Sequence, residues 1–191
     1  MLSASLCGPY LSAQAQADFG VDLQRNPIRT LAGPGVRVVV LIFAASDCPI
    51  SNRYVPEIAR LSREFGAAGA KHPTVKFWWV FPNPGDTAAV VAQHDREFAI
   101  HESVLLDPRQ KLVALAHAAI TPEAAVFAVR GGELDEVYHG RIDDRYITLG
   151  QERPQPQRHD LESAIQAVLH GKAVSQPEGP PVGCSIVFLQ K

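Results

Sequence analysis

The sequence predicts one α/β domain with a central mixed β-sheet flanked by helices and a C-terminal tail. Two continuous apolar runs, VRVVVLIF at 36–43 and VKFWWVF at 75–81, are typical of buried strands. Two further apolar runs flank Gly131-Gly132, which indicates a hairpin. The segments between the strands carry apolar residues at helical spacing. Strands separated by helices pair in parallel through right-handed crossovers, and the hairpin adds an antiparallel pair.

The expected elements alternate until the hairpin, in the order strand, helix, strand, helix, strand, helix, strand, strand, helix. Pro56 interrupts the first helix and is expected to kink it. Residues 171–191 are rich in Pro and Gly and are expected to pack back on the domain as a tail. The expected elements are Val36–Phe43, Ile50–Phe65, Val75–Phe81, Ala88–Ala99, Val104–Leu106, Gln110–Ala118, Ala125–Val129, Leu134–His139 and His159–Leu169.

Composition excludes several classes of protein. The 191 residues are 46% hydrophobic and 20% charged, which is a globular composition. A formal net charge of -2 leaves no basic footprint for a nucleic-acid partner. No apolar run approaches the roughly 20 residues that a membrane span needs.

Residues 1–17 are uncharged and end in an Ala-x-Ala pattern followed by Asp18, which resembles a signal-peptide cleavage site. The segment lacks a basic start, so we interpret it as a truncated signal peptide or as an ordinary N-terminal extension. The first interpretation predicts a periplasmic or secreted protein whose mature chain keeps Cys48 and Cys184, enough for one disulfide. The second predicts a cytoplasmic protein.

Cys48 is the leading candidate for a reactive residue. It lies where the first strand gives way to the first helix, and a helix N-terminus directs backbone N–H groups and a positive dipole end at its surroundings. That environment favours the thiolate, which is the reactive form of cysteine. Thr121-Pro122 precedes another strand, and a cis proline there would expose backbone for pairing with an extended partner.

These motifs make the chain resemble the thioredoxin-fold redoxins, the superfamily of peroxiredoxin-like proteins and thiol–disulfide oxidoreductases. The resemblance rests on Cys48-Pro49, Pro56, Thr121-Pro122 and the hairpin at 131–132. A bacterial peroxiredoxin-like subgroup, of the AhpC/TSA type, is similar through DCPISN at 47–52, GRIDD at 140–144 and GCSI at 183–186. The resemblance implies a thioredoxin-like domain over residues 18–170, thiol-based redox chemistry at Cys48, and a substrate groove shaped by Thr121 and Pro122.

The chain departs from both family patterns around its cysteine. Ser51 stands where a Cys-x-x-Cys motif has its second cysteine. Leu41 and Ala45 stand where peroxiredoxins carry Pro and Thr before the peroxide-reacting cysteine. Cys184, in the tail, is therefore the candidate resolving thiol, and it is expected to lie close to Cys48. The expected partner is a protein thiol or disulfide, or a peroxide, with no cofactor.

Two other functions remain open. Thioredoxin-fold copper proteins use thiolates and an imidazole, and Cu(I) prefers soft sulfur ligands. Cys48 and Cys184 with His94 form the alternative copper site, ahead of sets with His101, His117 or His139. The second alternative is a catalytically silent interaction domain. Arg141, Asp143, Asp144 and Arg145 are consistent with a salt-bridged turn or with a polar wall of the site, and Trp78 and Trp79 with the core.

Overall fold

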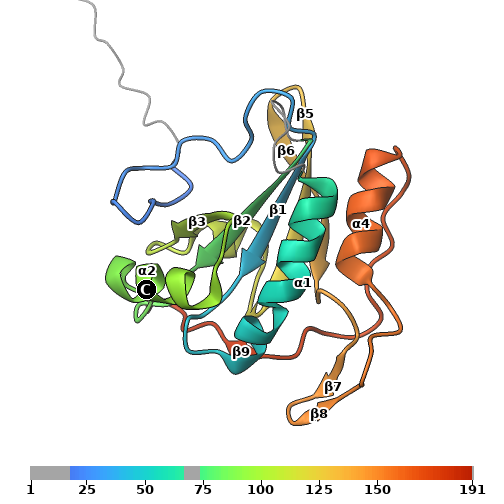
Figure 1. Ribbon diagram of the computed structural model, residues 1–191. Coiled ribbons are helices and arrows are strands. Elements are labelled where there is room, and N and C mark those ends of the chain that lie inside the picture. Colours follow the sequence, from blue (N-terminus) through green and yellow to red (C-terminus); the bar gives the residue numbers. More distant parts are fainter. Residues whose placement is uncertain (1–17, 67–73, 191) are drawn as a thin grey trace, which may run out of the picture.

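The computed structural model describes residues 18–66 and 74–190, so the candidate signal segment at 1–17 lies outside the described residues. Five strands form a central sheet in the order β3-β2-β1-β5-β6 (Figure 1). β1 pairs in parallel with β2 and β2 with β3, whereas β5 is antiparallel to both β1 and β6. The predicted central mixed sheet flanked by helices is therefore confirmed. The elements are β1 (Val38–Phe43), α1 (Pro49–Phe65), β2 (Val75–Phe81), α2 (Ala88–Phe98), β3 (Ser103–Leu106), α3 (Lys111–Leu115), β4 (Ile120–Thr121), β5 (Glu123–Arg130), β6 (Glu133–Gly140), β7 (Tyr146–Thr148), β8 (Gln151–Glu152), α4 (Asp160–Leu169) and β9 (Cys184–Ser185).

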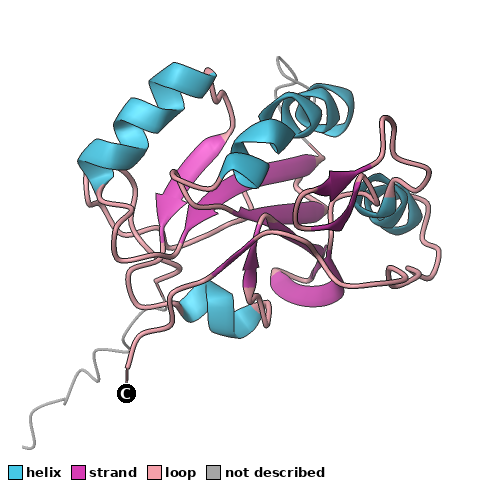
Figure 2. Ribbon diagram, turned by 90° about the horizontal axis from the view of Figure 1, so that it is seen from below, coloured by secondary structure: helices cyan, strands magenta, loops and turns pink. Residues whose placement is uncertain are grey.

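Strand alternation divides the core into two layers. On β1, Val40 and Ile42 face α1, α2 and α4, whereas Val39 and Leu41 face α3 and the N-terminal segment. Figure 2 shows the sheet between these two groups of helices. The tryptophans of β2 follow the same rule, because Trp79 belongs to the first layer and Trp78 to the second, as expected of core residues. β1 is thus buried on both faces, and its carboxyl end lies at the middle of the sheet's edge.

The structure differs from the sequence-based elements mainly around α3 and in the short strands. The predicted helix over 110–118 is limited to Lys111–Leu115, because Gln110 and His117 both adopt the left-handed region, with φ of 53° and 51°. The two-residue strands β4 and β9 were not expected. They pair with each other and bring the tail against the domain. α1 continues through Pro56.

Among the described residues, no helix combines the length and the apolar character that crossing a membrane would require.

Candidate functional site

Cys48 is the residue that precedes the first turn of α1. Its φ of −86° and ψ of 110° are extended, Pro49 occupies the first helical position, and Asn52 N–H donates to Cys48 O at 3.1 Å. The expectation that β1 ends at Phe43 and that Cys48 opens the following helix is confirmed. The Cys48 side chain is 0% exposed. A fully buried thiol reacts only when whatever covers it moves.

The loop that delivers Cys48 is fixed by a buried polar network. Ser46 donates through both its N–H and its hydroxyl to Asp86 Oδ1, at 3.0 and 2.5 Å. Asn52 Nδ2 donates to Ser46 O at 3.3 Å, which leaves Asn52 Oδ1 to accept from His94 Nε2 at 2.7 Å. Burial lowers the pKa of His94, against the opposing effect of Asp86 and other carboxylates. His94 is therefore a neutral residue that anchors this network.

The thiol itself lies between the cis-proline segment and the tail. The Thr121-Pro122 peptide bond is cis, as predicted, and Thr121 O accepts from Cys48 Sγ at 3.2 Å. Cys184 Sγ donates to Cys48 Sγ at 2.8 Å, and both cysteines are free thiols. The expected proximity of Cys48 and Cys184 is thus present in the structure. Four residues identified from sequence, Cys48, Cys184, Thr121 and Pro122, meet at one place.

Electrostatics separate the two thiols. Burial alone would raise the pKa of Cys48, but the nearby Cys184 thiol, the Ser51 hydroxyl and backbone N–H, and the Thr121 side chain outweigh it and lower that pKa. The pKa of Cys184 is raised, first by burial, then by its hydrogen bond to Cys48, and then by the negative charges of Cys48 and Asp47. Cys48 therefore ionises first, and Cys184 keeps its proton.

Ser51 contributes to this difference in a way that the sequence did not reveal. Its side chain is 1% exposed, and its Oγ has no hydrogen-bond partner among the described residues. The hydroxyl and the Ser51 N–H both lower the pKa of Cys48, because both are available to the thiolate. The position that lacks a second cysteine serves as a hydrogen-bond donor.

The tail reaches Cys48 as a strand. β9 pairs antiparallel with β4, with Cys184 opposite Thr121 and Ser185 opposite Ile120. Thr121 Oγ1 donates to Cys184 O at 3.3 Å, and Ile186 is 3% exposed within the second core layer. Directly before Cys184, a Cβ at Gly183 would overlap Thr121 O, so only glycine allows this close approach of the two backbones.

Two side-chain amides that the sequence analysis did not single out hold the tail beyond Cys184. Gln110 Nε2 donates to Val187 O at 2.7 Å, and Gln110 Oε1 accepts from Leu189 N–H at 3.1 Å. Asn83 Oδ1 accepts from Val187 N–H at 2.9 Å. The sequence contains no local sign of these contacts, because they join residues 77 to 104 positions apart.

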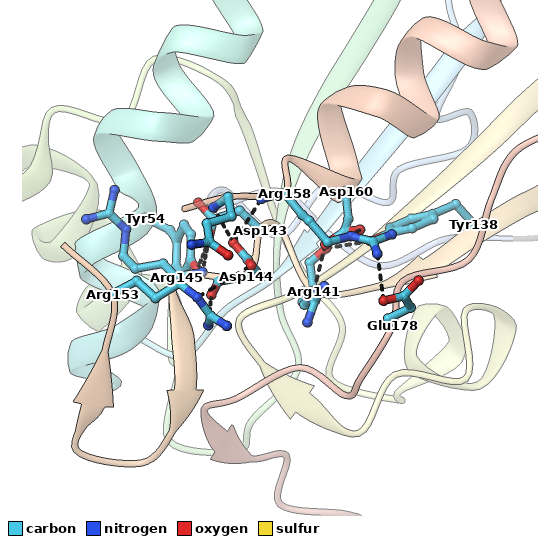
Figure 3. Close-up of polar contacts among 11 residues, drawn as sticks. Tyr54, Tyr138, Arg141, Asp143, Asp144, Arg145, Arg153, Arg158, Asp160 and Glu178 are labelled. Carbon is cyan, nitrogen blue, oxygen red and sulfur yellow. Dashed lines mark hydrogen bonds and ion pairs between the residues drawn. The ribbon is translucent and has the colours of Figure 1, made fainter. Parts of the chain in front are cut away.

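The remaining sequence candidates form structural contacts. Asp143 accepts from the Tyr54 hydroxyl, and Asp144 Oδ1 accepts from the backbone N–H groups of residues 157 and 158 (Figure 3). Arg141 Nε donates to Asp160 Oδ2 at 2.7 Å, with both side chains largely buried. These interactions join the turn after β6 to α1 and α4, as expected of the salt-bridged turn.

The alternative copper ligands are not gathered around one point. In the described part of the chain, the only group of three or more His, Cys, Asp or Glu ligand atoms within 4.8 Å of one another is Glu57, His159 and Glu162. Cys48, Cys184 and His94 do not form such a group. Arg60 pairs with both Glu57 and Glu162 and already supplies them with positive charge.

Solved structures share this fold. An uncharacterized conserved protein from Geobacillus kaustophilus has a TM-score of 0.73 and 23% identity, over 92% of this chain and 91% of that one. A hypothetical protein from Sinorhizobium meliloti has a TM-score of 0.69 and 23% identity, over 90% and 91%. A secreted Mycobacterium tuberculosis disulfide oxidoreductase homologous to E. coli DsbE has a TM-score of 0.51 and 13% identity, over 82% and 96%.

The fold of this chain is thioredoxin-like, as predicted. No protein-family model and no curated protein matches the sequence. The finer assignment to the peroxiredoxin-like subgroup stays a prediction.

Proposed function

We propose that this protein is a thiol-dependent oxidoreductase that exchanges disulfides, with Cys48 as the attacking thiolate and Cys184 as the resolving thiol. The observation that carries the proposal is the arrangement of the two sulfurs, 2.8 Å apart with Cys184 as donor. Donors around Cys48 lower its pKa, whereas the surroundings of Cys184 raise the pKa of Cys184. Cys48 would therefore attack first as a thiolate, and Cys184 would react second.

The proposed reaction takes two steps. The Cys48 thiolate attacks one sulfur of a partner disulfide, a new Cys48–partner S–S bond forms, and the second partner sulfur leaves as a thiolate that takes up a proton. Cys184 then loses its proton and attacks Cys48 Sγ, the Cys48–Cys184 bond forms, and the first partner sulfur leaves. The partner disulfide gains two electrons and becomes two thiols, and the protein becomes the disulfide. A dithiol reductant returns the protein to its starting form.

A hydroperoxide can serve as oxidant at the same pair, which is the peroxiredoxin-like form of the proposal. The thiolate takes the terminal oxygen and becomes a sulfenic acid, and the alcohol or water leaves. Cys184 then displaces that hydroxyl as water and forms the same disulfide. The two forms differ in the intermediate at Cys48, which is a mixed disulfide with a partner disulfide as oxidant and a sulfenic acid with a hydroperoxide.

The compartment proposed for this chemistry is the periplasm or the exterior of the cell, with the cytoplasm as the alternative. The pattern that ends at Ala17 and the secreted disulfide oxidoreductase among the structural neighbours support export. Fractionation of cells, followed by mass spectrometry of the protein's N-terminus, tests this. Mature protein that begins near Asp18 in the exported fraction supports it, and uncleaved cytoplasmic protein contradicts it.

Mass spectrometry of the Cys7→Ser chain tests the redox function, because this variant leaves only the two site thiols. Reduced protein is treated separately with glutathione disulfide and with hydrogen peroxide. We expect an intramolecular Cys48–Cys184 disulfide in the first case, and in the second if peroxide is also an oxidant. In Cys184→Ser, the glutathione adduct or the sulfenic acid at Cys48 should persist.

The same samples distinguish the other functions. If both thiols stay reduced with either oxidant and become protected from alkylation when Cu(I) is added, a copper-binding or copper-delivery function replaces the redox proposal. If neither oxidant nor Cu(I) affects them, the chain is an interaction domain.

A further inference from the structure

We propose that Gln110 is a positioning residue that, with Asn83, holds the tail over Cys48 and so controls both access to the attacking thiol and the presence of the resolving one. The proposal rests on the proposed function for its catalytic consequence, but not for its structural part. Gln110 and Asn83, with the backbone of Val187 and Leu189 that they bind, are called the amide clamp.

The clamp binds backbone groups of the tail and not its side chains. Asn83 accepts a hydrogen bond from the N–H of Val187. Gln110 donates to the C=O of Val187 and accepts from the N–H of Leu189. The side chains of Val187 and Leu189 remain 59% and 45% exposed, so little apolar burial holds this part of the tail. Three hydrogen bonds from fixed side chains take the place of a neighbouring strand.

Gln110 is itself firmly held. It is 8% exposed, and its Nε2 also donates to Pro82 O at 3.3 Å. Its backbone is left-handed, with φ of 53°. Its N–H donates to Asp107 O, and its O accepts from Ala114 N–H. The left-handed conformation directs the chain into α3, and the side-chain amide lies between the domain and the tail. A buried amide with both ends satisfied in this way is costly to leave unpaired.

The contacts of the amide clamp lie outside the cysteine pair. Cys48 and Cys184 are both free thiols, yet β9 is in place and Cys48 is 0% exposed. The hydrogen bonds of the amide clamp join residues other than the two cysteines, so we expect them to hold the tail over Cys48 in the reduced protein. Non-covalent contacts keep Cys184 beside Cys48 at a high effective concentration, and an incoming disulfide must wait for the tail to lift.

Opposite effects on two rates follow from this arrangement. Loosening the clamp uncovers Cys48 and speeds its first reaction. It also lowers the local concentration of Cys184 and slows resolution of the mixed disulfide. A substitution that merely destabilised the fold would not move the two rates in opposite directions while the unfolding transition stays in place.

The first arm of the test measures access in the full chain with Cys7→Ser and Cys184→Ser, where Cys48 is the sole thiol. We expect Gln110→Ala to raise the rate of iodoacetamide alkylation by about tenfold, the size expected for two lost hydrogen bonds. Gln110→Glu keeps the acceptor for Leu189 N–H but sets a carboxylate oxygen against Val187 O and Pro82 O, and should raise the rate at least as much. Gln93→Ala removes an exposed glutamine that pairs with Glu97 on α2 and serves as the matched control, with no change expected.

The second arm measures resolution in Cys7→Ser protein with Cys184 intact. Glutathione disulfide is added, and the lifetime of the Cys48–glutathione adduct is followed by mass spectrometry. We expect Gln110→Ala to lengthen this lifetime severalfold. Thermal unfolding of each variant shows whether the fold is kept, and Asn83→Ala, which removes the partner of Val187 N–H, replaces Gln110→Ala if the latter does not fold.

The outcomes are separable. Unchanged alkylation in folded Gln110→Ala or Asn83→Ala overturns the clamp, and so does a shorter adduct lifetime. If glutathione disulfide gives no adduct in any variant, the proposed function fails, and the alkylation arm alone then decides whether the clamp covers Cys48.

Discussion

The two cysteines belong to regions that are built in different ways. Cys48 follows β1, a strand buried on both faces at the centre of the sheet, and its position is set by the fold itself. Cys184 lies on a two-residue strand that is held by a short ladder with β4 and by the Thr121 hydroxyl. Beyond the strand, the tail is held by one buried isoleucine and by three hydrogen bonds to Gln110 and Asn83. In the proposed reaction, the core would position the attacking thiol and a tail that can detach would position the resolving thiol. A redox pair needs one fixed member and one that can give way to a substrate.

The difference also governs acidity. The fixed position provides Cys48 with the Ser51 N–H and hydroxyl of a helix N-terminus, which lower its pKa. The tail gives Cys184 no such donors, and burial beside Cys48 and Asp47 raises the pKa of Cys184. Place in the fold and order of reaction are therefore linked.

The largest expected effect is the contrast between removing each thiol. Cys48→Ser should abolish disulfide reduction, because no other thiol at the site is activated. Cys184→Ser should allow the first step and stop at a stable mixed disulfide, which mass spectrometry detects. If Cys184→Ser turns over at the wild-type rate with glutathione disulfide, the resolving role of the tail is contradicted.

Stability should separate the two regions next. Ile58 on α1 is 0% exposed, and Ile58→Ala should lower the free energy of unfolding by about 2–5 kcal/mol. Ile186 is 3% exposed, but the tail can detach locally, so Ile186→Ala should cost only about 1 kcal/mol in global unfolding. Urea titration monitored by circular dichroism measures both. Equal losses would mean that the tail unfolds only together with the core.

The sequence predicted the fixed region well and the removable one poorly. β1, α1 and the position of Cys48 follow from an apolar run, helical spacing and Pro49, all of which are local. The approach of Cys184 to Cys48 was predicted from the missing cysteine at position 51. The pairing of β9 with β4 and the hydrogen bonds from Gln110 and Asn83 that hold the tail there were not predicted. Gln110 was predicted to be the first residue of the helix over 110–118. Its left-handed backbone and its contacts with Val187 and Leu189 were not predicted, because they depend on residues far away in the chain. Ser51 was interpreted only as the position that lacks a second cysteine, because its effect on the pKa of Cys48 leaves no pattern in the sequence.

A smaller effect tests how the tail approaches the domain. Gly183→Ala would place a Cβ against Thr121 O, so the backbone of β9 must shift away from β4. We expect faster alkylation of Cys48, by severalfold, with little change in global stability. Gly179→Ala is not a suitable control, because Gly179 has a positive φ of 103°. Gly85→Ala, where a Cβ meets nothing within 4 Å, is the better one and should leave the alkylation rate unchanged.

A further prediction concerns a single hydroxyl, that of Ser51, beside Cys48. The thiolate is the form that reacts with iodoacetamide, so the alkylation rate rises with pH through the pKa of Cys48 and is flat above it. Ser51→Ala removes a donor that lowers this pKa, so the midpoint of the profile should move to higher pH. Below the midpoint the rate should fall by about tenfold, which corresponds to about 1.5 kcal/mol for a hydrogen bond to a charged group. Ser62→Ala, on the same helix but away from the thiol, should leave the profile unchanged. A Ser51→Ala midpoint equal to that of the parent protein would mean that the backbone N–H groups and Cys184 alone activate Cys48, and the acidity of the fixed thiol would then depend on the removable region.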